Sequence, residues 1–102
     1  MQPIYHVTTR AEWEAAQQKG YYEAPSLALE GFIHASADER QVQGVLQRYF
    51  AGKTDLVKLT IDPQKLTHEL KWELAPSVGE EFPHVYGPIN VDAVTAVEPL
   101  DS

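Results

Sequence analysis

The sequence contains no cysteine. Disulfide bonds, iron–sulfur clusters, thiolate zinc sites and a cysteine nucleophile are therefore excluded. The H-E-x-x-H and H-x-H spacings of metal centres are also absent, and no G-x-S-x-G surrounds a serine. Neither a metalloenzyme nor a serine hydrolase has a motif here to support it.

Basic residues are scarce. Eight Lys and Arg stand against 15 Asp and Glu, which gives a formal net charge of -7. Affinity for a nucleic-acid backbone comes mainly from Lys and Arg that displace counterions, so nucleic acid is not an expected partner. Arg40, Arg48, Lys53 and Lys58 fall within one stretch. We interpret them as the solvated faces of a helix and a strand edge.

Long apolar runs are absent as well, because none approaches the ~20 residues that cross a bilayer. The first residues show neither the basic nor the apolar region of a signal peptide. We therefore expect a cytoplasmic protein of bacterial type without membrane contact. The 102 residues, 43% of them hydrophobic, predict one domain over residues 1–102.

The N-terminal half predicts two helices. Thr9-Arg10-Ala11-Glu12 has the pattern of a capping box, and Lys19-Gly20 is typical of the end of that helix. Ser36-Ala37-Asp38-Glu39 is a second capping box before a helix that continues to about Phe50. Two short strands are expected at residues 3–7 and 31–35. Residues 21–30 lack periodicity and are expected to form a loop.

The C-terminal half predicts a sheet. Residues 55–61 alternate, with Val57, Leu59 and Ile61 on the buried face, and Asp62-Pro63 opens a helical turn. Further strands are expected at residues 70–74, 84–86 and 93–97, with a loop at 75–83. The predicted fold is α+β, with two helices near the N-terminus and a small, mostly antiparallel split sheet.

Three histidines lie in similarly built segments, IYHVT, GFIHAS and FPHVYG. Each is followed two residues later by a hydroxyl, in the pairs His6 and Thr8, His34 and Ser36, His84 and Tyr86. Residues two apart on a strand point to the same face. Imidazole exchanges a proton near neutral pH more readily than other side chains. Three such strands around one cleft would form a polar site.

These histidines also have other interpretations. His6 and His34 could be core residues that bond to the backbone or to the neighbouring hydroxyls. All three, with His84, could converge on a zinc ion. Ser36 would cap the second helix, whose N-terminus would then offer N–H groups to a phosphate or pyrophosphate.

Several other side chains can be placed from the pattern. Trp13 is expected in the core and His68 at the surface. Glu73 alternates with Trp72, so it is exposed or lines the cleft if Trp72 is core. Tyr5, Tyr21 and Tyr22 could stack on a base or a nicotinamide, or they could belong to the core.

The ordered segments IYHVT, Trp13 with Gly20, SLALEGFIHAS, DLVKLTID, KWE and FPHVYG resemble the bacterial "domain of unknown function 952" family over nearly the whole chain. More distantly, YHVT, a tryptophan, a Gly-ended helix and FIHAS followed by a helix are similar to the C-terminal half of the RNA 2'-phosphotransferases. That resemblance implies the ADP-ribosyltransferase-like fold, whose members bind NAD in a cleft between two small sheets.

The distant resemblance also implies roles for individual residues. His6 would orient the ribose and the amide of NAD, flanked by Tyr5 and Thr8. His34 with Ser36 would hold the ribose or pyrophosphate. His84 and Tyr86 stand where the superfamily often has a Glu, and they would close the third side.

The sequence thus predicts an NAD-related enzyme that transfers or hydrolyses at the nicotinamide–ribose bond, with a small-molecule nucleotide as its partner. The expected catalytic residues are His6, His34 and His84, and the expected binding residues are Tyr5, Thr8, Ser36 and Tyr86. The alternatives are a non-catalytic nucleotide-binding module, a metal-dependent hydrolase with a three-histidine site, and a structural partner protein.

Overall fold

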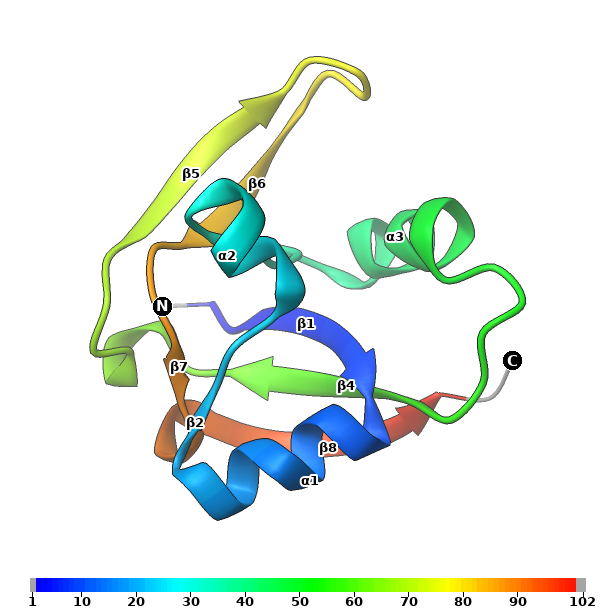
Figure 1. Ribbon diagram of the computed structural model, residues 1–102. Helices are drawn as coiled ribbons and strands as arrows, with labels where there is room; N and C mark the ends of the chain where they lie inside the picture. The colour runs from blue at the N-terminus through cyan, green and yellow to red at the C-terminus, as the bar shows by residue number, and fades with distance from the viewer. Residues whose placement is uncertain (1, 101–102) are drawn as a thin grey trace.

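A computed structural model describes residues 2–100 of the chain (Figure 1). Its helices and strands follow the order β1 Ile4–Thr9, α1 Arg10–Lys19, β2 Tyr21–Tyr22, α2 Pro25–Glu30, β3 Ile33–His34, α3 Glu39–Tyr49, β4 Leu56–Ile61, η1 Pro63–Lys65, β5 Leu70–Ala75, β6 Glu80–Val85, β7 Ile89–Asn90, η2 Val91–Ala93 and β8 Val94–Leu100.

Within the described residues, the strands form antiparallel sheets of order β1-β4-β8, β2-β7 and β3-β6-β5. The helices α1, α2 and α3 all precede β4. The β5–β6 hairpin extends away from the β1-β4-β8 sheet, and α3 lies on the same side of that sheet (Figure 1). The predicted α+β class with helices first and split antiparallel sheets is confirmed.

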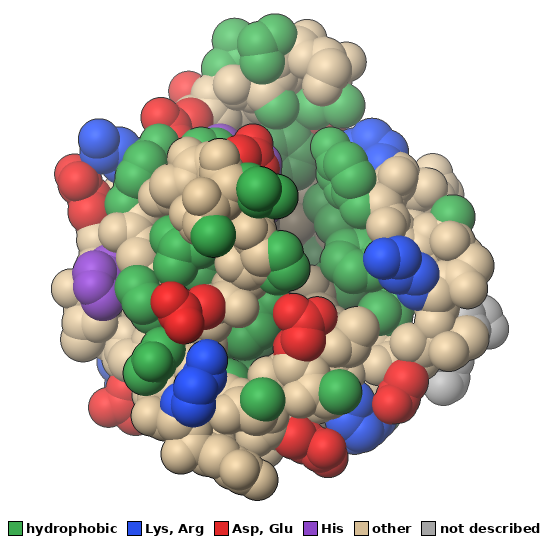
Figure 2. Space-filling view, in the orientation of Figure 1, with side chains coloured by type: hydrophobic (Ala, Val, Ile, Leu, Met, Phe, Trp, Pro, Cys, Tyr) green, Lys and Arg blue, Asp and Glu red, His purple; other side chains and the backbone are tan. Residues whose placement is uncertain are grey.

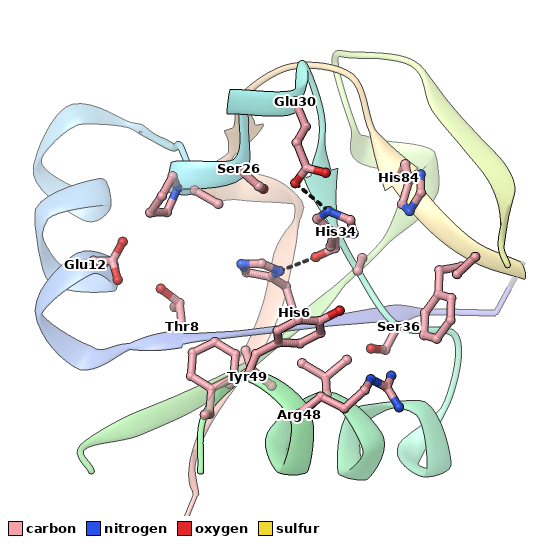
Figure 3. Close-up of a pocket in the computed structure, with 18 of the residues that line it drawn as sticks. His6, Thr8, Glu12, Ser26, Glu30, His34, Ser36, Arg48, Tyr49 and His84 are labelled. Atoms are coloured by element: carbon pink, nitrogen blue, oxygen red, sulfur yellow. Dashed lines mark hydrogen bonds and ion pairs between the residues drawn. The ribbon is translucent and has the colours of Figure 1, made fainter. Parts of the chain in front are cut away.

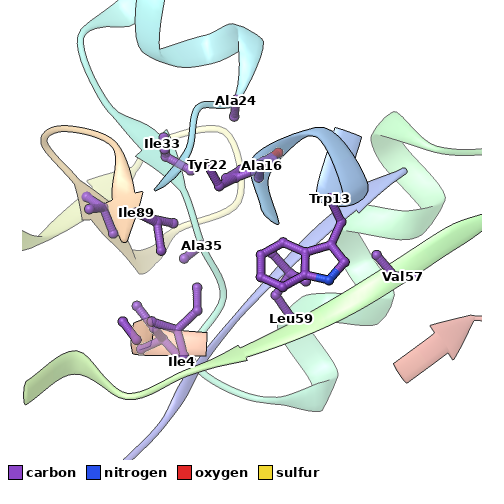
Figure 4. Close-up of a cluster of buried hydrophobic side chains, with 13 residues drawn as sticks. Ile4, Trp13, Ala16, Tyr22, Ala24, Ile33, Ala35, Val57, Leu59 and Ile89 are labelled. Carbon is purple, nitrogen blue, oxygen red and sulfur yellow. The ribbon is translucent and has the colours of Figure 1, made fainter. Parts of the chain in front are cut away.

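The main core lies between the β1-β4-β8 sheet and the elements that cover it (Figure 4). Val57, Leu59 and Ile61 are each 0% exposed, as the alternation in this segment predicts. Trp13 packs with them from α1, so its predicted core position is also confirmed. Each fully buried aliphatic side chain of this kind contributes about 1.5–3 kcal/mol of transfer free energy.

Helix α1 has the predicted caps. The Thr9 hydroxyl accepts a hydrogen bond from the Glu12 backbone N–H at 3.1 Å. The Glu12 carboxylate accepts from the Thr9 hydroxyl rather than reaching the Thr9 N–H. Gly20 ends the helix at φ 91°, a conformation that glycine adopts without a steric penalty.

Two predictions in the N-terminal half are wrong. Residues 21–30 are not a loop, since they form strand β2 and the six-residue helix α2. Pro25 begins that helix because its fixed φ suits a first helical position, but so short a helix shows no readable period. Ser36 is not a helix cap, because its backbone pairs with that of Tyr5.

Helix α3 is capped instead by Asp38, whose carboxylate accepts from the Gln41 N–H at 2.9 Å. An acidic side chain therefore already occupies this helix N-terminus, and the premise of the predicted phosphate site, that Ser36 caps the helix, is wrong. The predicted loop at 75–83 is shorter than expected, because β6 begins at Glu80. Gly79, at φ 70°, lies in the tight turn before it.

Candidate functional site

A cleft of about 700 Å³ separates α3 and the tip of the β5–β6 hairpin from β1, α1 and α2. Figure 2 shows it as a hollow with mostly apolar walls. This volume lies within the range of about 300–1,000 Å³ that is typical of small-molecule sites. The polar and charged residues that line it come from separate segments: His6, Thr8, Thr9, Glu12, Tyr22, Ser26, Glu30, His34, Ser36, Arg48, Tyr49, Lys53, Ser77 and His84.

His6 is the most constrained of the three predicted histidines (Figure 3). Its Nδ1 lies 2.5 Å from the backbone oxygen of His34, and its Nε2 lies 2.9 Å from the Tyr22 hydroxyl. In a neutral ring the nitrogen that faces a carbonyl carries the proton, so Nε2 is the acceptor. The Tyr22 hydroxyl also lies 2.9 Å from Thr8 Oγ1, and its single proton serves one acceptor at a time.

Burial decides the charge of this group. Desolvation lowers the pKa of His6 from 6.5 to about 4; the hydrogen bond to the His34 backbone opposes the change, and the neighbouring His34 ring adds to it. Burial likewise raises the pKa of Tyr22. At neutral pH the floor of the cleft therefore carries an uncharged imidazole with a fixed tautomer and a protonated tyrosine.

His34 lies beside a carboxylate. Its Nε2 is 3.0 Å from Glu30 Oε2, and both side chains are half exposed. The ring also contacts two aromatic rings edge-on, Phe32 at 4.8 Å and His84 at 4.9 Å between centroids. Figure 3 shows Glu30 descending from α2 toward this imidazole. The pair places a carboxylate at the edge of the cleft.

His84 belongs to a second carboxylate–imidazole pair. Its Nδ1 lies 2.8 Å from Glu73 Oε1, and the Tyr86 hydroxyl donates to the same oxygen. These two bonds, that from Tyr86 first, lower the pKa of Glu73. The imidazole stacks on Phe32 at 4.2 Å with an interplanar angle of 18°. Because Nδ1 is engaged, Nε2 is the ring nitrogen left for a ligand.

The structure brings together five of the seven predicted site residues. His6, Thr8, His34, Ser36 and His84 all line the cleft.

Tyr5 and Tyr86 lie outside that lining. Tyr5 points to the opposite face of β1 from His6 and packs against the cluster that contains Val42. The Lys58 Nζ atom lies 5.2 Å from the centroid of its ring. Tyr86 reaches the site only through its bond to Glu73.

Two of the predicted histidine–hydroxyl pairs are connected through a third side chain rather than by a direct bond. Tyr22 connects His6 to Thr8, and Glu73 connects His84 to Tyr86. Sequence reasoning left Glu73 as exposed or cleft-lining on the premise that Trp72 is core. Trp72 is 50% exposed.

The sequence missed several groups near the cleft. Glu12, Glu30 and Tyr49 carry no local signal for such a role, because they come from three separate helices. Arg48 was interpreted as part of a solvated helix face, yet it lines the cleft. Arg40, by contrast, is bound outside the cleft by Glu80.

The alternative of a three-histidine zinc site is contradicted by the structure of the described residues. Across residues 2–100, no three His, Asp or Glu side chains are grouped as metal ligands would be. The physical reason is visible at His6, where a carbonyl and a tyrosine hydroxyl occupy both ring nitrogens.

No helix in this part of the chain is long and apolar enough to span a membrane.

Comparison with known proteins places the chain in a family. The model of the family described as "Protein of unknown function (DUF952)" matches residues 7–97. The chain belongs to this family. The predicted family membership is thereby confirmed, and the more distant resemblance to the ADP-ribosyltransferase-like fold stays a prediction. None of the curated proteins compared with this DUF952 chain matches it.

Solved structures of a family relative are closely similar. The crystal structure of protein CC0527 from Caulobacter crescentus is 39% identical, with a TM-score of 0.87 over 97% of this chain and 86% of that chain. Its solution NMR structure is 38% identical, with a TM-score of 0.82 over 99% of this chain and 86% of that one. The fold is therefore shared with a bacterial protein of similar length.

Proposed function

We propose that the cleft of this DUF952 protein binds NAD or a related nucleotide in the manner of the ADP-ribosyltransferase-like fold. One observation carries the proposal. The segments that contain His6, His34 and His84 are far apart in sequence, and they converge on one cleft of about 700 Å³. A cleft of this size accommodates a ligand as large as a nucleotide.

The chemistry of the floor supports a nicotinamide riboside group. The neutral His6 ring, held by the His34 carbonyl and the Tyr22 hydroxyl, places no positive charge in the floor of the cleft that would repel the nicotinamide cation. The His84 ring, which lines the cleft and stacks on Phe32, adds aromatic surface to the site.

The proposed reaction breaks the bond between the ribose C1' and the nicotinamide nitrogen. The bonding electrons pass to nicotinamide, which leaves neutral, and the ribose becomes an oxocarbenium ion. Water or another acceptor adds its oxygen to C1' and gives up a proton. His84 can take that proton at Nε2, because Glu73 holds its Nδ1.

A carboxylate near the cationic sugar would stabilise this transition state. The segment FPHVYG offers none, but Glu30 lines the cleft beside His34. Glu30 is the side chain that we propose for this role. Its engagement by His34 is the observation that favours the alternative, a module that binds the nucleotide without chemistry.

The test of binding is a titration with NAD followed by amide NMR shifts. We expect saturable shifts around His6, His34 and Ser36 in the wild type. The double variant His6→Ala with His34→Ala should lose them while keeping a dispersed spectrum. His68→Ala is the matched control, since His68 is exposed and lies outside the cleft lining. Absence of shifts at millimolar NAD would refute the proposal.

A second measurement separates catalysis from binding. Nicotinamide release is followed during prolonged incubation of NAD with the wild type, Glu30→Gln and Glu73→Gln. Release that both variants slow without weaker NAD binding supports the transferase or hydrolase. Saturable binding without release supports the binding module.

A further inference from the structure

Helix α3 carries an internal glycine that its own sequence does not explain. Gly44 lies in the middle of Glu39–Tyr49, where glycine lowers helix stability relative to alanine. No positive φ accounts for it, since Gly44 is not among the residues with that conformation. A reason for glycine here must come from packing.

The packing partner is Arg48, one turn further along α3. A Cβ atom at Gly44 would lie 3.0 Å from Arg48 Nη1 and 3.4 Å from Nη2. The guanidinium therefore lies against the bare backbone at Gly44, and a Cβ atom there would require it to shift by a few tenths of an ångström. The same arginine lines the cleft, and Figure 3 shows it on the side of the cleft where Ser36 lies.

Among residues 2–100, the Arg48 guanidinium has no carboxylate within ion-pair distance, although, after the hydrogen bonds from Arg40, its charge contributes weakly to the lowered pKa of Glu80. By contrast, carboxylates form ion pairs with Arg10, Arg40 and Lys58. Arg48 is exposed at the cleft, and its guanidinium lies over the ring of Tyr49, with 5.9 Å between Cζ and the ring centroid. It offers paired N–H donors that fit a phosphate or carboxylate.

Ser36 supplies an independent observation. The residue is 3% exposed and lines the cleft, yet its hydroxyl makes no side-chain hydrogen bond within the described residues. Among the described residues, no side-chain oxygen or nitrogen is both fully buried and without a hydrogen-bond partner. Because the Ser36 oxygen has no such partner, it must be reachable from the cleft. A buried hydroxyl open to a cleft is suited to bonding with a ligand.

We infer that Arg48 and Ser36 form a phosphate-binding subsite in the cleft, for which Gly44 provides the space. The inference rests in part on the proposed function, because it assigns the phosphate or pyrophosphate group of the nucleotide to this subsite. It moves the anion site from the start of α3, where Asp38 already caps the helix, to the side of that helix facing the cleft.

The test compares ligands with and without phosphate. NAD and nicotinamide riboside are titrated by NMR into the wild type, Arg48→Gln, Ser36→Ala and the control Arg10→Gln. Arg10→Gln removes the same charge outside the cleft. We expect Arg48→Gln to weaken NAD binding by about 10- to 100-fold and to leave nicotinamide riboside unchanged. Ser36→Ala should act in the same direction, more weakly, and Arg10→Gln should have little effect.

Gly44→Ala tests the packing argument separately. We expect a more stable helix, because alanine favours it, together with weaker NAD binding from the displaced guanidinium. NAD binding as tight as in the wild type would show that the space at Gly44 is not needed.

Titration with inorganic pyrophosphate separates the subsite from the nucleotide proposal. We expect it to shift the Arg48 Nε–H signal and, in Arg48→Gln, to cause no shift at Ser36. Such shifts without any NAD binding would support the phosphate-binding subsite and refute the proposal that the cleft binds a nucleotide. NAD binding that Arg48→Gln leaves unchanged would overturn the subsite and keep the nucleotide. No response to either ligand would overturn both.

Discussion

The neutral state of His6 makes the stability of this protein depend on pH in a defined window. The pKa of His6 is 6.5 in the unfolded chain and about 4 in the folded protein. Between these values the unfolded state binds more protons than the folded state. The contribution of neutral His6 to the free energy of unfolding is therefore fully present above pH 6.5, and it is lost as the pH falls toward 4.

The magnitude follows from the two pKa values. One histidine changes the free energy of unfolding by at most about 1.4 kcal/mol per pH unit. Integrated from pH 7.5 down to pH 4.5, the loss from His6 is about 2.5 kcal/mol. The window stops at pH 4.5 because the carboxylates with lowered pKa values, such as Glu73 and Glu80, protonate below it.

The assay is urea denaturation at several pH values for the wild type and His6→Asn. Asparagine can still donate to the His34 carbonyl, but it does not titrate. The wild type should lose about 2.5 kcal/mol more than the variant between pH 7.5 and 4.5. The His6 ring signals in NMR should also stay unchanged down to about pH 5. Equal losses in the two proteins, or a His6 ring that titrates near 6.5, would refute the reasoning.

Three further changes test the hydrogen bonds around the site. Tyr22→Phe removes a hydroxyl that has two partners, and we expect urea denaturation to show a loss of about 1–3 kcal/mol. Tyr86→Phe should raise the pKa of Glu73 toward 4.5, as measured by carboxyl ¹³C NMR, because the Tyr86 hydroxyl is the main cause of its lowering. Arg40→Gln should raise the pKa of Glu80 from about 2 and speed amide exchange at the hairpin turn, since Arg40 binds both Glu80 oxygens.

Each of these has an outcome that contradicts it. Tyr21→Phe is the control for Tyr22→Phe, because the adjacent ring is 40% exposed; equal losses would place the effect outside the cleft. If the pKa of Glu73 were unchanged in Tyr86→Phe, the Tyr86 hydroxyl would not be bonded to Glu73 in solution. Unchanged exchange in Arg40→Gln would mean that α3 does not hold the hairpin.

Local patterns predicted those elements whose signals are local. The alternation in β4 identified its buried face, and the Thr9 and Gly20 signals gave the ends of α1. The prediction that Ser36 caps α3 is wrong because two residues in one short segment, Ser36 and Asp38, could each cap this helix. The choice of Asp38 depended on a distant pairing between Ser36 and Tyr5, which no local pattern contains.

The sequence by itself determined the fold class, the family, and the three segments that carry the histidines. These follow from periodicity, capping and the spacing of motifs, all of which are written along the chain. It also placed His6, Thr8, His34, Ser36 and His84 in one candidate site, and each of them lines the cleft.

Only the tertiary structure decided which groups complete that site. Tyr22, Glu30 and Arg48 reach the cleft from elements separated by loops, and Glu73 supports His84 across the hairpin. The charge of His6 was decided there too, because burial and the His34 carbonyl set its pKa and tautomer. Contacts between residues far apart in sequence, and the exclusion of water around them, exist only once the chain has folded.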